Sequence, residues 1–161
     1  MSDNKIKNEG VDIKSHRLSK KEIEDNFSDL HAPLSPIEAL IEADRCYFCY
    51  DAPCTTACPS DIDVPGFIQS IRSDNLTGAA EKILSENIFG GMCARDCPTE
   101  ELCQQACVRN DHEDKPVEIG LLQRYATDSV LDNGVKLFSR KKDTGKSIAV
   151  SYTHLTLPTK A

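Results

Sequence analysis

The chain has 161 residues, no tryptophan and a mean hydropathy of -0.41, which predicts one domain with a modest apolar core. Its net charge is -7 and no basic stripe is interleaved with aromatic residues, which excludes nucleic acid as an expected partner. No apolar run approaches the ~20 residues that cross a bilayer, and the first residues lack a secretory signal pattern. We therefore expect a cytoplasmic protein without a membrane partner.

The first part of the chain, residues 1–34, is polar and charged and predicts an arm with one short amphipathic helix in KKEIEDNFSDL. A capping box with proline at the first helical position follows over residues 35–38, SPIE. Apolar residues continue at helical spacing, namely Ile37, Leu40 and Ile41. This pattern predicts a helix that leads to Cys46.

The stretch CYFCYDAPCTTACPSDIDVP contains too many helix breakers for regular structure and predicts a loop around a bound group. Two short helices are expected after it, over residues 65–73 and 77–86. The second carries three apolar residues on one face, which are Ala80, Ile83 and Leu84.

A second loop, GGMCARDCP, is predicted to begin at the glycine pair 90–91. Thr99 is then placed to cap a helix that carries Cys103 and Cys107 at i, i+4 on one face.

After the charged turn NDHEDKP, the run VEIGLLQRYATDSVLDNG predicts a helix that Asn133 and Gly134 can close. Its buried stripe is expected to be Ile119, Leu122, Ala126 and Val130. The only strand-like segment is KSIAV, so residues 135–150 are expected to be a linker and the start of another domain. The tail, residues 151–161, resembles translated adapter sequence and is expected to be foreign to the protein. Residues 35–134 are the predicted helical domain.

All eight cysteines lie in two closely spaced groups. The first reads C-x2-C-x4-C-x3-C-P and the second reads C-x3-C-P-x4-C-x3-C, and their members are Cys46, Cys49, Cys54 and Cys58, and Cys93, Cys97, Cys103 and Cys107. Because cytosolic thiols are kept reduced, metal binding is favoured over disulfides. Such runs with Cys-Pro are typical of ferredoxin sites for [4Fe-4S] clusters, which need about four soft anionic ligands.

Two zinc sites remain an alternative, although structural zinc sites favour two C-x2-4-C pairs separated by a longer loop. Nothing in the sequence singles out a histidine partner for a nucleophilic cysteine. The four histidines lie outside the cysteine groups and are expected to be solvated; they are His16, His31, His112 and His154.

With these motifs in view, residues 35–130 resemble the N-terminal iron–sulfur domain of the dihydropyrimidine dehydrogenase family, above all its small, NAD-dependent bacterial subunit. The stretches that carry the resemblance are RCYFCYDAPCTTACP, FIQSIRSDNLTGAAEKILSEN, CARDCPTEELCQQAC and IGLLQRYATD. The small subunit of glutamate synthase shares the first cysteine group, so an electron-input domain of that type is an alternative. A zinc-stabilised interaction module is another.

The resemblance implies a mainly α fold, namely a small helical bundle of the α-helical ferredoxin type whose two cysteine-rich loops enclose two [4Fe-4S] clusters. It implies an electron relay between FAD and the flavin of an FMN-containing catalytic partner, in a hetero-oligomer. The glycine-rich G-x-G-x-x-G motif that binds a dinucleotide does not follow KSIAV here. FAD and NAD(P)H are therefore expected only in missing downstream domains, and this segment is not expected to be catalytically competent alone.

The resemblance also implies the ligands. Since a cysteine before proline tends to serve the neighbouring cluster, Cys58 is expected to leave the first group. The family pattern then gives Cys46, Cys49, Cys54 and Cys107 for the first cluster, and Cys58, Cys97, Cys103 and Gln123 for the second. From the residues alone, Cys93 would complete the second site instead, and Gln123 would be a helix-surface amide.

Overall fold

The computed structural model describes residues 18–143 and 145. The predicted strand at 146–150 and the predicted foreign tail lie outside the described residues. The chain divides into two compact units, Met1–Pro33 and Leu34–Ala161.

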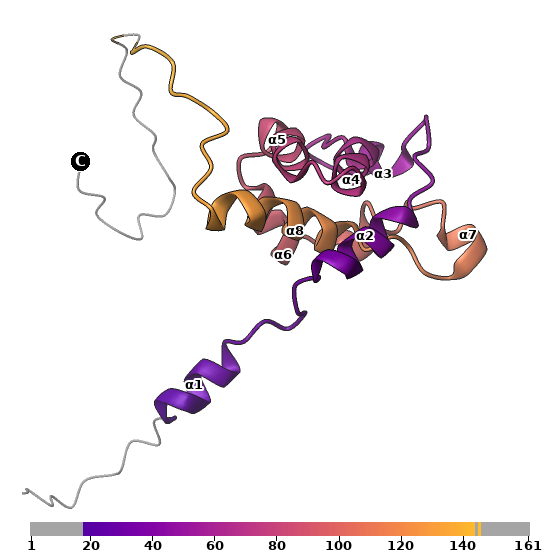
Figure 1. Cartoon of the computed structure of the whole chain (residues 1–161). Helices are drawn as coiled ribbons and strands as arrows, with labels where there is room; N and C mark the ends of the chain where they lie inside the picture. The colour runs from indigo at the N-terminus through magenta and orange to yellow at the C-terminus, as the bar shows by residue number, and fades with distance from the viewer. Residues whose placement is uncertain (1–17, 144, 146–161) are drawn as a thin grey trace, which may run out of the picture. The chain divides into compact units, whose positions relative to one another are not determined.

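In the first unit, α1 (Lys20–Asn26) lies within the segment predicted to be helical. Ser19 forms a capping box with Glu22, which satisfies backbone donors at the start of the helix. None of the α1 residues is buried, and the nearby Phe27 and Leu30 are also exposed. Figure 1 labels this helix.

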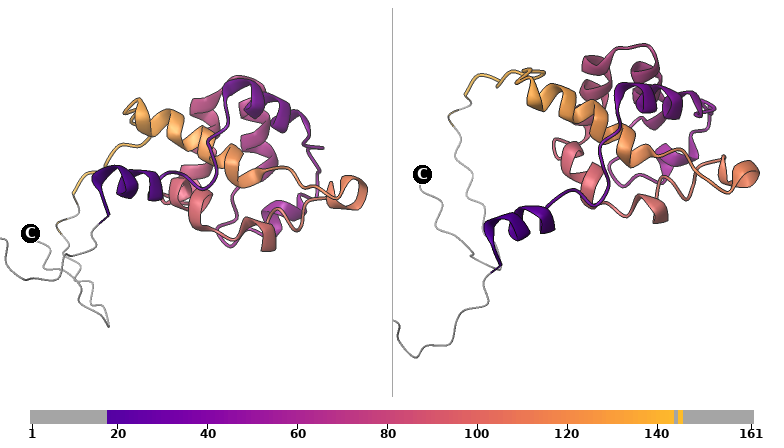
Figure 2. Two further views of the ribbon diagram at one scale, coloured as in Figure 1. Left: turned by 90° about the horizontal axis from the view of Figure 1, so that it is seen from below. Right: turned by 60° about the horizontal axis from the view of Figure 1, so that its bottom comes forward.

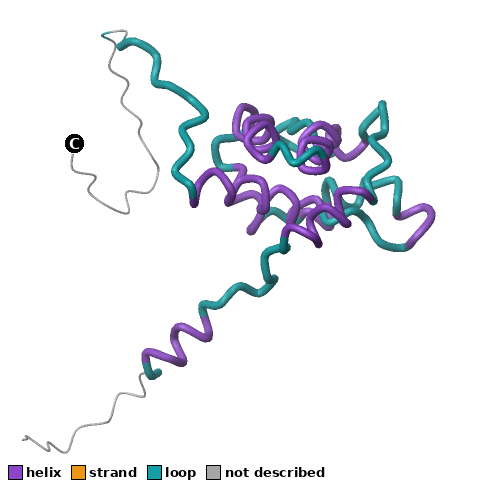
Figure 3. Tube along the Cα trace, viewed as in Figure 1, coloured by secondary structure: helices purple, strands orange, loops and turns teal. Residues whose placement is uncertain are grey.

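The second unit is built from helices and loops, and the described residues contain no strand (Figure 3). Its helices are α2 (Pro36–Asp44), α3 (Pro53–Thr56), α4 (Val64–Arg72), α5 (Leu76–Glu86), α6 (Gly90–Asp96), α7 (Asn110–Glu113) and α8 (Ile119–Asp132), with a short 3-10 helix at Thr99–Glu101. The prediction of a mainly α fold is confirmed.

The helices of this unit pack around α8, which contacts α4, α5 and α6 (Figures 1 and 2). Helix α4 also packs on α5 and α2. The core between them includes Phe67, Ile68, Ile83, Ile119 and Leu122, all nearly or fully buried. Four of the cysteines are partly buried and pack against this core, namely Cys46, Cys54, Cys58 and Cys107. The cysteine loops are therefore mounted directly on the bundle.

Several predicted helix boundaries are confirmed. The predicted capping box of Ser35 and Glu38 begins α2. Helices α4 and α5 each begin one residue before the predicted start, after side-chain caps at Asp63 and Asn75 that were not predicted. Gly134 follows α8 with φ +61°, a left-handed conformation that favours glycine. The predicted stripe of α8 is buried, including Ile119, Leu122, Ala126 and Val130.

The structure shows which face of α2 is buried. Its apolar residues Ile37, Leu40 and Ile41 are 72%, 46% and 61% exposed, and its packed face is formed by Ala39, Glu42 and Ala43. Two alanines four residues apart lie on one face of a helix and let the backbones of neighbouring helices approach closely. The helix is thus correctly predicted, and the structure adds that it buries its alanine face.

Two predictions are wrong. The glycine pair 90–91 begins α6 rather than a loop, because the segment Gly90–Asp96 packs on α8. No regular helix carries Cys103 and Cys107 together, because the chain after Thr99 forms only the short 3-10 helix and then turns.

Candidate metal centres

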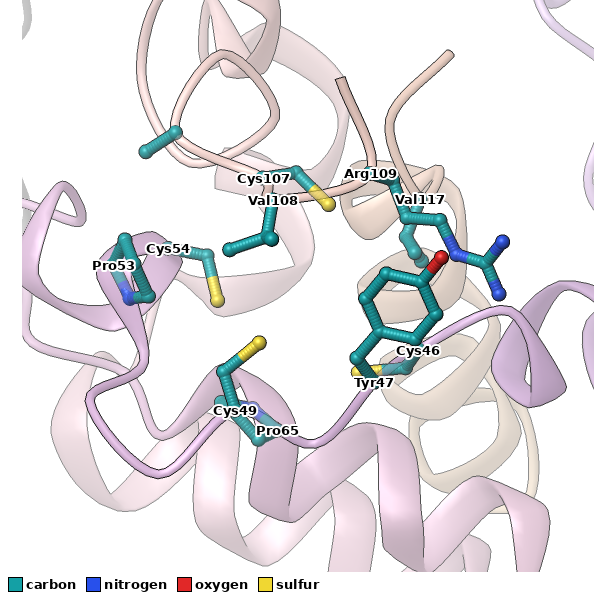
Figure 4. A pocket seen from close by; sticks show the side chains of 11 residues that line it. Cys46, Tyr47, Cys49, Pro53, Cys54, Pro65, Cys107, Val108, Arg109 and Val117 are labelled. Atoms are coloured by element: carbon teal, nitrogen blue, oxygen red, sulfur yellow. The ribbon is translucent and has the colours of Figure 1, made fainter. Parts of the chain in front are cut away.

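The first centre is a cavity lined by Cys46, Cys49, Cys54 and Cys107. Figure 4 shows the sulfur atoms of these four cysteines directed toward a shared space. Cys46 and Cys49 come from the loop after α2, Cys54 lies in α3, and Cys107 precedes α7. Two stretches that are distant in the sequence, residues 46–54 and the segment at Cys107, therefore meet at this cavity.

The loop after α2 contains two non-glycine residues in the left-handed region, Phe48 with φ 51° and Ala52 with φ 37°. Such conformations cost about 1–3 kcal/mol each and persist where the surroundings impose them. Here they lie on either side of Cys49 in the sequence. The amide of Phe48 also donates to Cys46 Sγ at 3.4 Å, which places a backbone N–H on a sulfur of the cavity.

The second centre is a cavity lined by four cysteines and one amide side chain, namely Cys58, Cys93, Cys97, Cys103 and Gln123. Cys93 belongs to α6, Cys97 directly follows it, and Gln123 lies on α8. Five soft or polar donors therefore surround one cavity.

Each cysteine group of the sequence thus contributes one member to the cavity that the other group mainly lines. Cys58 belongs to the first group but lines the second cavity, and Cys107 belongs to the second group but lines the first. The turn after the 3-10 helix separates Cys103 from Cys107 and lets them face different cavities. The resemblance implies the same exchange of Cys58 and Cys107, whereas the choice between Cys93 and Gln123 as a ligand stays a prediction, because both line the second cavity.

Burial raises the pKa of two thiols in each cavity. It raises the pKa of Cys54 to about 11 and that of Cys103 to about 12. Neighbouring thiols add to the increase, Cys46 and Cys107 for Cys54, and Cys58 and Cys97 for Cys103. Burial also raises the pKa of Cys46 and Cys97. A bound metal must therefore displace protons from these sulfurs.

The donor chemistry of the cavities fits an iron–sulfur cluster. Thiolate sulfurs are the soft ligands that such clusters use, and apolar residues line both cavities, for example Val117 in the first and Ile62 in the second. Among the described residues, no group of three or more His, Cys, Asp or Glu side chains is arranged to hold a single metal ion. The cysteines instead surround a space.

The amides of Gln123 and Asn87 are positioned at the second cavity. Gln123 is 7% exposed, and its Nε2 donates to the carbonyl of Gly90 at 2.7 Å. Asn87 donates through Nδ2 to Cys93 Sγ at 3.1 Å. Sequence reasoning did not identify Asn87, because an asparagine six residues before a cysteine matches no ligand motif.

Arg109 is a second residue that sequence reasoning did not identify. Its guanidinium lies 4.0 Å from the centroid of the Tyr47 ring, and its Nε donates to the carbonyl of Arg45 at 2.5 Å. It therefore ties the segment after Cys107 to the segment before Cys46. Its position two residues after a cysteine was the only signal in the sequence.

The histidines line neither of these cavities in the part of the chain that the structure describes. His112 packs edge-on against Tyr47 with ring centroids 6.4 Å apart, and His31 is exposed. His16 and His154 lie outside the described residues. None of the described helices is long and apolar enough to cross a membrane.

Residues 23–135 match the family model described as dihydropyrimidine dehydrogenase domain II, 4Fe-4S cluster. The chain is 43% identical over 126 residues to the NAD-dependent dihydropyrimidine dehydrogenase subunit PreT of Escherichia coli O157:H7, which covers 78% of the chain and 30% of that relative.

Two relatives come from Escherichia coli strain K12. Its PreT subunit is 42% identical over 126 residues, again 78% of the chain and 30% of the relative. UacF, which is named as an oxidoreductase, is 34% identical over 119 residues, or 73% of the chain and 18% of the relative. The chain thus spans 30% of the length of the PreT proteins it matches.

Proposed function

Because the chain belongs to the dihydropyrimidine dehydrogenase domain II, 4Fe-4S cluster family, we propose that it holds two [4Fe-4S] clusters and relays electrons through them inside a larger oxidoreductase. The observation that carries the proposal is the pair of cavities, each lined by four cysteines, in a chain with eight cysteines. When bound, such clusters supply one-electron transfer at potentials set by net charge, hydrogen bonds and exposure.

The proposed ligands of the first cluster are Cys46, Cys49, Cys54 and Cys107, which line the first cavity together. For the second cluster they are Cys58, Cys97, Cys103 and Gln123, all from the second cavity. Gln123 is the fourth ligand that the family resemblance implies, and its Oε1 is the atom left for that role because its Nε2 donates to the carbonyl of Gly90. The same resemblance leaves Cys93 unligated, although it lines this cavity.

The remaining steps of the relay belong to the whole protein, of which this chain corresponds to a part. We propose that NAD(P)H and FAD bind in domains that follow the cysteine domain in the complete protein. The clusters would carry electrons from that FAD to the FMN of a catalytic partner subunit that reduces a pyrimidine base, in a cytoplasmic hetero-oligomer. The name of PreT, an NAD-dependent dihydropyrimidine dehydrogenase subunit, supports this proposal.

Reconstitution tests the cluster content. Protein reconstituted anaerobically with iron and sulfide should bind about eight iron and eight sulfide per chain, as two cubanes require, and show broad visible absorption. Stoichiometric zinc without sulfide would contradict the proposal and favour the zinc-stabilised module.

Ligand variants test the exchange between the two groups. Cys107→Ser should lose the first cluster and keep the second, although Cys107 lies in the second group of the sequence. Its matched partner Cys58→Ser should lose the second cluster and keep the first. Iron analysis and electron paramagnetic resonance of the reduced proteins measure both results. The reverse pattern would show that each sequence group ligates its own cluster.

A further inference from the structure

The lining of the second cavity contains two hydroxyl groups, those of Ser60 and Thr99, beside its cysteine sulfurs. Among the described residues, no Lys, Arg, Asp or Glu lines this cavity, whereas Arg109 lines the first. The potential of an iron–sulfur cluster depends on net charge, on hydrogen bonds to its sulfurs and on solvent exposure. The side chains that line the second cavity can therefore act on a cluster there chiefly through hydrogen bonds.

The carboxamide of Asn87, the residue that ends α5, is fixed beside this cavity. Its Oδ1 accepts from the amide of Phe89 at 2.9 Å, which assigns the oxygen and the nitrogen of the side chain. Its Nδ2 then donates to Ser60 Oγ and to Cys93 Sγ, each at 3.1 Å. A carboxamide nitrogen carries two hydrogens, so both are used.

Ser60 accepts this hydrogen bond and keeps its own proton to donate. A hydroxyl has one O–H donor and two acceptor lone pairs, and the N–H of Asn87 takes one lone pair. No described residue accepts the proton of Ser60. Because the N–H of Asn87 occupies one side of the oxygen, the proton is directed away from Asn87. Ser60 lines a cavity whose most numerous acceptors are cysteine sulfurs.

We propose that Ser60 donates a hydrogen bond to a sulfur of the second cluster, and that Asn87 is the positioning residue for this donor. The inference rests on the proposed two-cluster function, and it does not depend on whether Cys93 or Gln123 is the fourth ligand. In each transfer one electron enters or leaves the cluster. The proton stays on Ser60 Oγ, and no covalent bond forms or breaks there.

This hydrogen bond should raise the reduction potential of the second cluster. An added electron increases the negative charge on the cluster sulfurs, and a hydrogen bond to a more negative acceptor is stronger. The bond therefore stabilises the reduced state more than the oxidised state. The first cluster has a separate lining and serves as an internal reference in the same molecule.

Ser60→Ala removes the donor, and Ser60→Thr keeps a hydroxyl at the same position. Redox titration of cluster-loaded protein, followed by electron paramagnetic resonance, should give a lower second potential and an unchanged first potential in Ser60→Ala. Ser60→Thr should recover part of the shift. Electron–nuclear double resonance of the reduced second cluster, in water and in heavy water, should show an exchangeable proton that Ser60→Ala loses. The variants Cys107→Ser and Cys58→Ser assign the two signals.

Two other hydroxyl residues supply matched controls. Thr99→Val removes the second hydroxyl of the lining, to which no described residue donates a hydrogen bond, and should shift the second potential less than Ser60→Ala. Ser70→Ala removes a part-buried hydroxyl that donates to the carbonyl of Gly66 at 2.9 Å and lines neither cavity. This variant should leave both potentials unchanged.

Asn87→Ala tests the positioning role. It should lower the second potential, and it should lower it less in a Ser60→Ala background than in the unmodified chain, because both residues act through one hydroxyl. The shift that remains in that background measures the direct hydrogen bond from Asn87 to Cys93. Equal shifts in the two backgrounds would show that Asn87 does not position Ser60.

Three results with Ser60→Ala would overturn the proposal. An unchanged second potential or a retained signal from the exchangeable proton would show that Ser60 is not the donor. Loss of the second cluster would assign Ser60 to cluster binding instead, because a donor that only adjusts the potential is not needed to hold the cluster. In each case about eight iron per chain in the unmodified protein would leave the two-cluster proposal intact, and its absence would refute that proposal instead.

Discussion

Gly90→Ala should destabilise the chain at the junction of α5, α6 and α8, whereas Gly91→Ala should not. A Cβ at Gly90 would lie 2.4 Å from Ile83 Cγ2, far inside contact distance. Ile83 is fully buried and cannot move toward solvent. At Gly91 the nearest atom to a new Cβ is Leu131 Cδ1 at 3.4 Å, and Leu131 is exposed.

The size of the difference follows from two opposing effects. Alanine stabilises a helix by up to about 1 kcal/mol relative to glycine, and this gain applies at both positions. Overpacking a rigid core costs about 1–3 kcal/mol and applies only at Gly90. The free energy of unfolding should therefore be about 1–3 kcal/mol lower for Gly90→Ala than for Gly91→Ala.

Anaerobic urea unfolding of the cluster-loaded variants, followed by circular dichroism, measures this difference. With a slope of about 1–3 kcal/mol per molar urea, the two midpoints should differ by roughly 1 M. Because the carbonyl of Gly90 accepts from Gln123, Gly90→Ala should also alter the spectrum of the second cluster and leave the first unchanged. Equal midpoints, or a higher midpoint for Gly90→Ala, would refute the packing argument.

Substitutions at four other positions test separate parts of the structure. Phe67→Ala removes a fully buried ring and should lower the free energy of unfolding by about 3–5 kcal/mol, measured by the same urea titration. Arg109→Gln removes the cation above Tyr47 and should lower the potential of the first cluster alone in a redox titration, while Arg109→Lys should restore part of it. Ser35→Ala should lower the free energy of unfolding by about 1 kcal/mol, and Ser35→Asp should not. Hydrogen bonds from Ser35 lower the pKa of Glu38, so this cap is formed at neutral pH and lost as pH falls through that lowered pKa; Glu38→Gln should flatten the loss.

Local signals in the sequence predicted the helix boundaries well. The capping box at Ser35 and the close of α8 at Gly134 depend on residues within one turn of the boundary, so their physics is present in the sequence itself. The helical spacing of apolar residues in α8 was also sufficient to predict its buried face, because that face packs against several helices at once.

Features that depend on tertiary packing were not predictable in this way. Glycine pairs usually interrupt helices, but α6 begins at Gly90 because the missing side chain allows close approach to Ile83. Ile37 and Ile41 have the spacing of a buried stripe, yet α2 buries its alanine face instead. Periodicity identifies a helix but does not say which face meets a neighbour.

Two kinds of evidence in the sequence predicted the candidate centres, namely the spacing of the cysteines and the family resemblance. The spacing of the cysteines indicated clusters, whereas the exchange of Cys58 and Cys107 came from the family resemblance and agrees with the cavities. Asn87 and Arg109 could not be predicted, because neither is a ligand type and each acts through a contact between distant segments.

The exchange of ligands gives the chain two short bridges between the proposed clusters. Cys54 and Cys58 are four residues apart and face different cavities, and so do Cys103 and Cys107. Each bridge is anchored to the bundle by a side chain within it. Thr55 Oγ1 accepts from the amide of Val64 at the start of α4, at 3.1 Å.

On the other bridge, the buried Gln104 accepts through Oε1 from the amide of Gly120 at the start of α8, also at 3.1 Å. Cys58 follows the end of α3 by two residues, and its amide donates to the carbonyl of Thr55 at 3.0 Å, so a single short turn joins Cys54 to Cys58. The two anchors attach both bridges to helices of one core. Under the proposed ligation, each bridge joins one cluster to the other, and the packing of α4 against α8 holds the two bridges in place relative to each other.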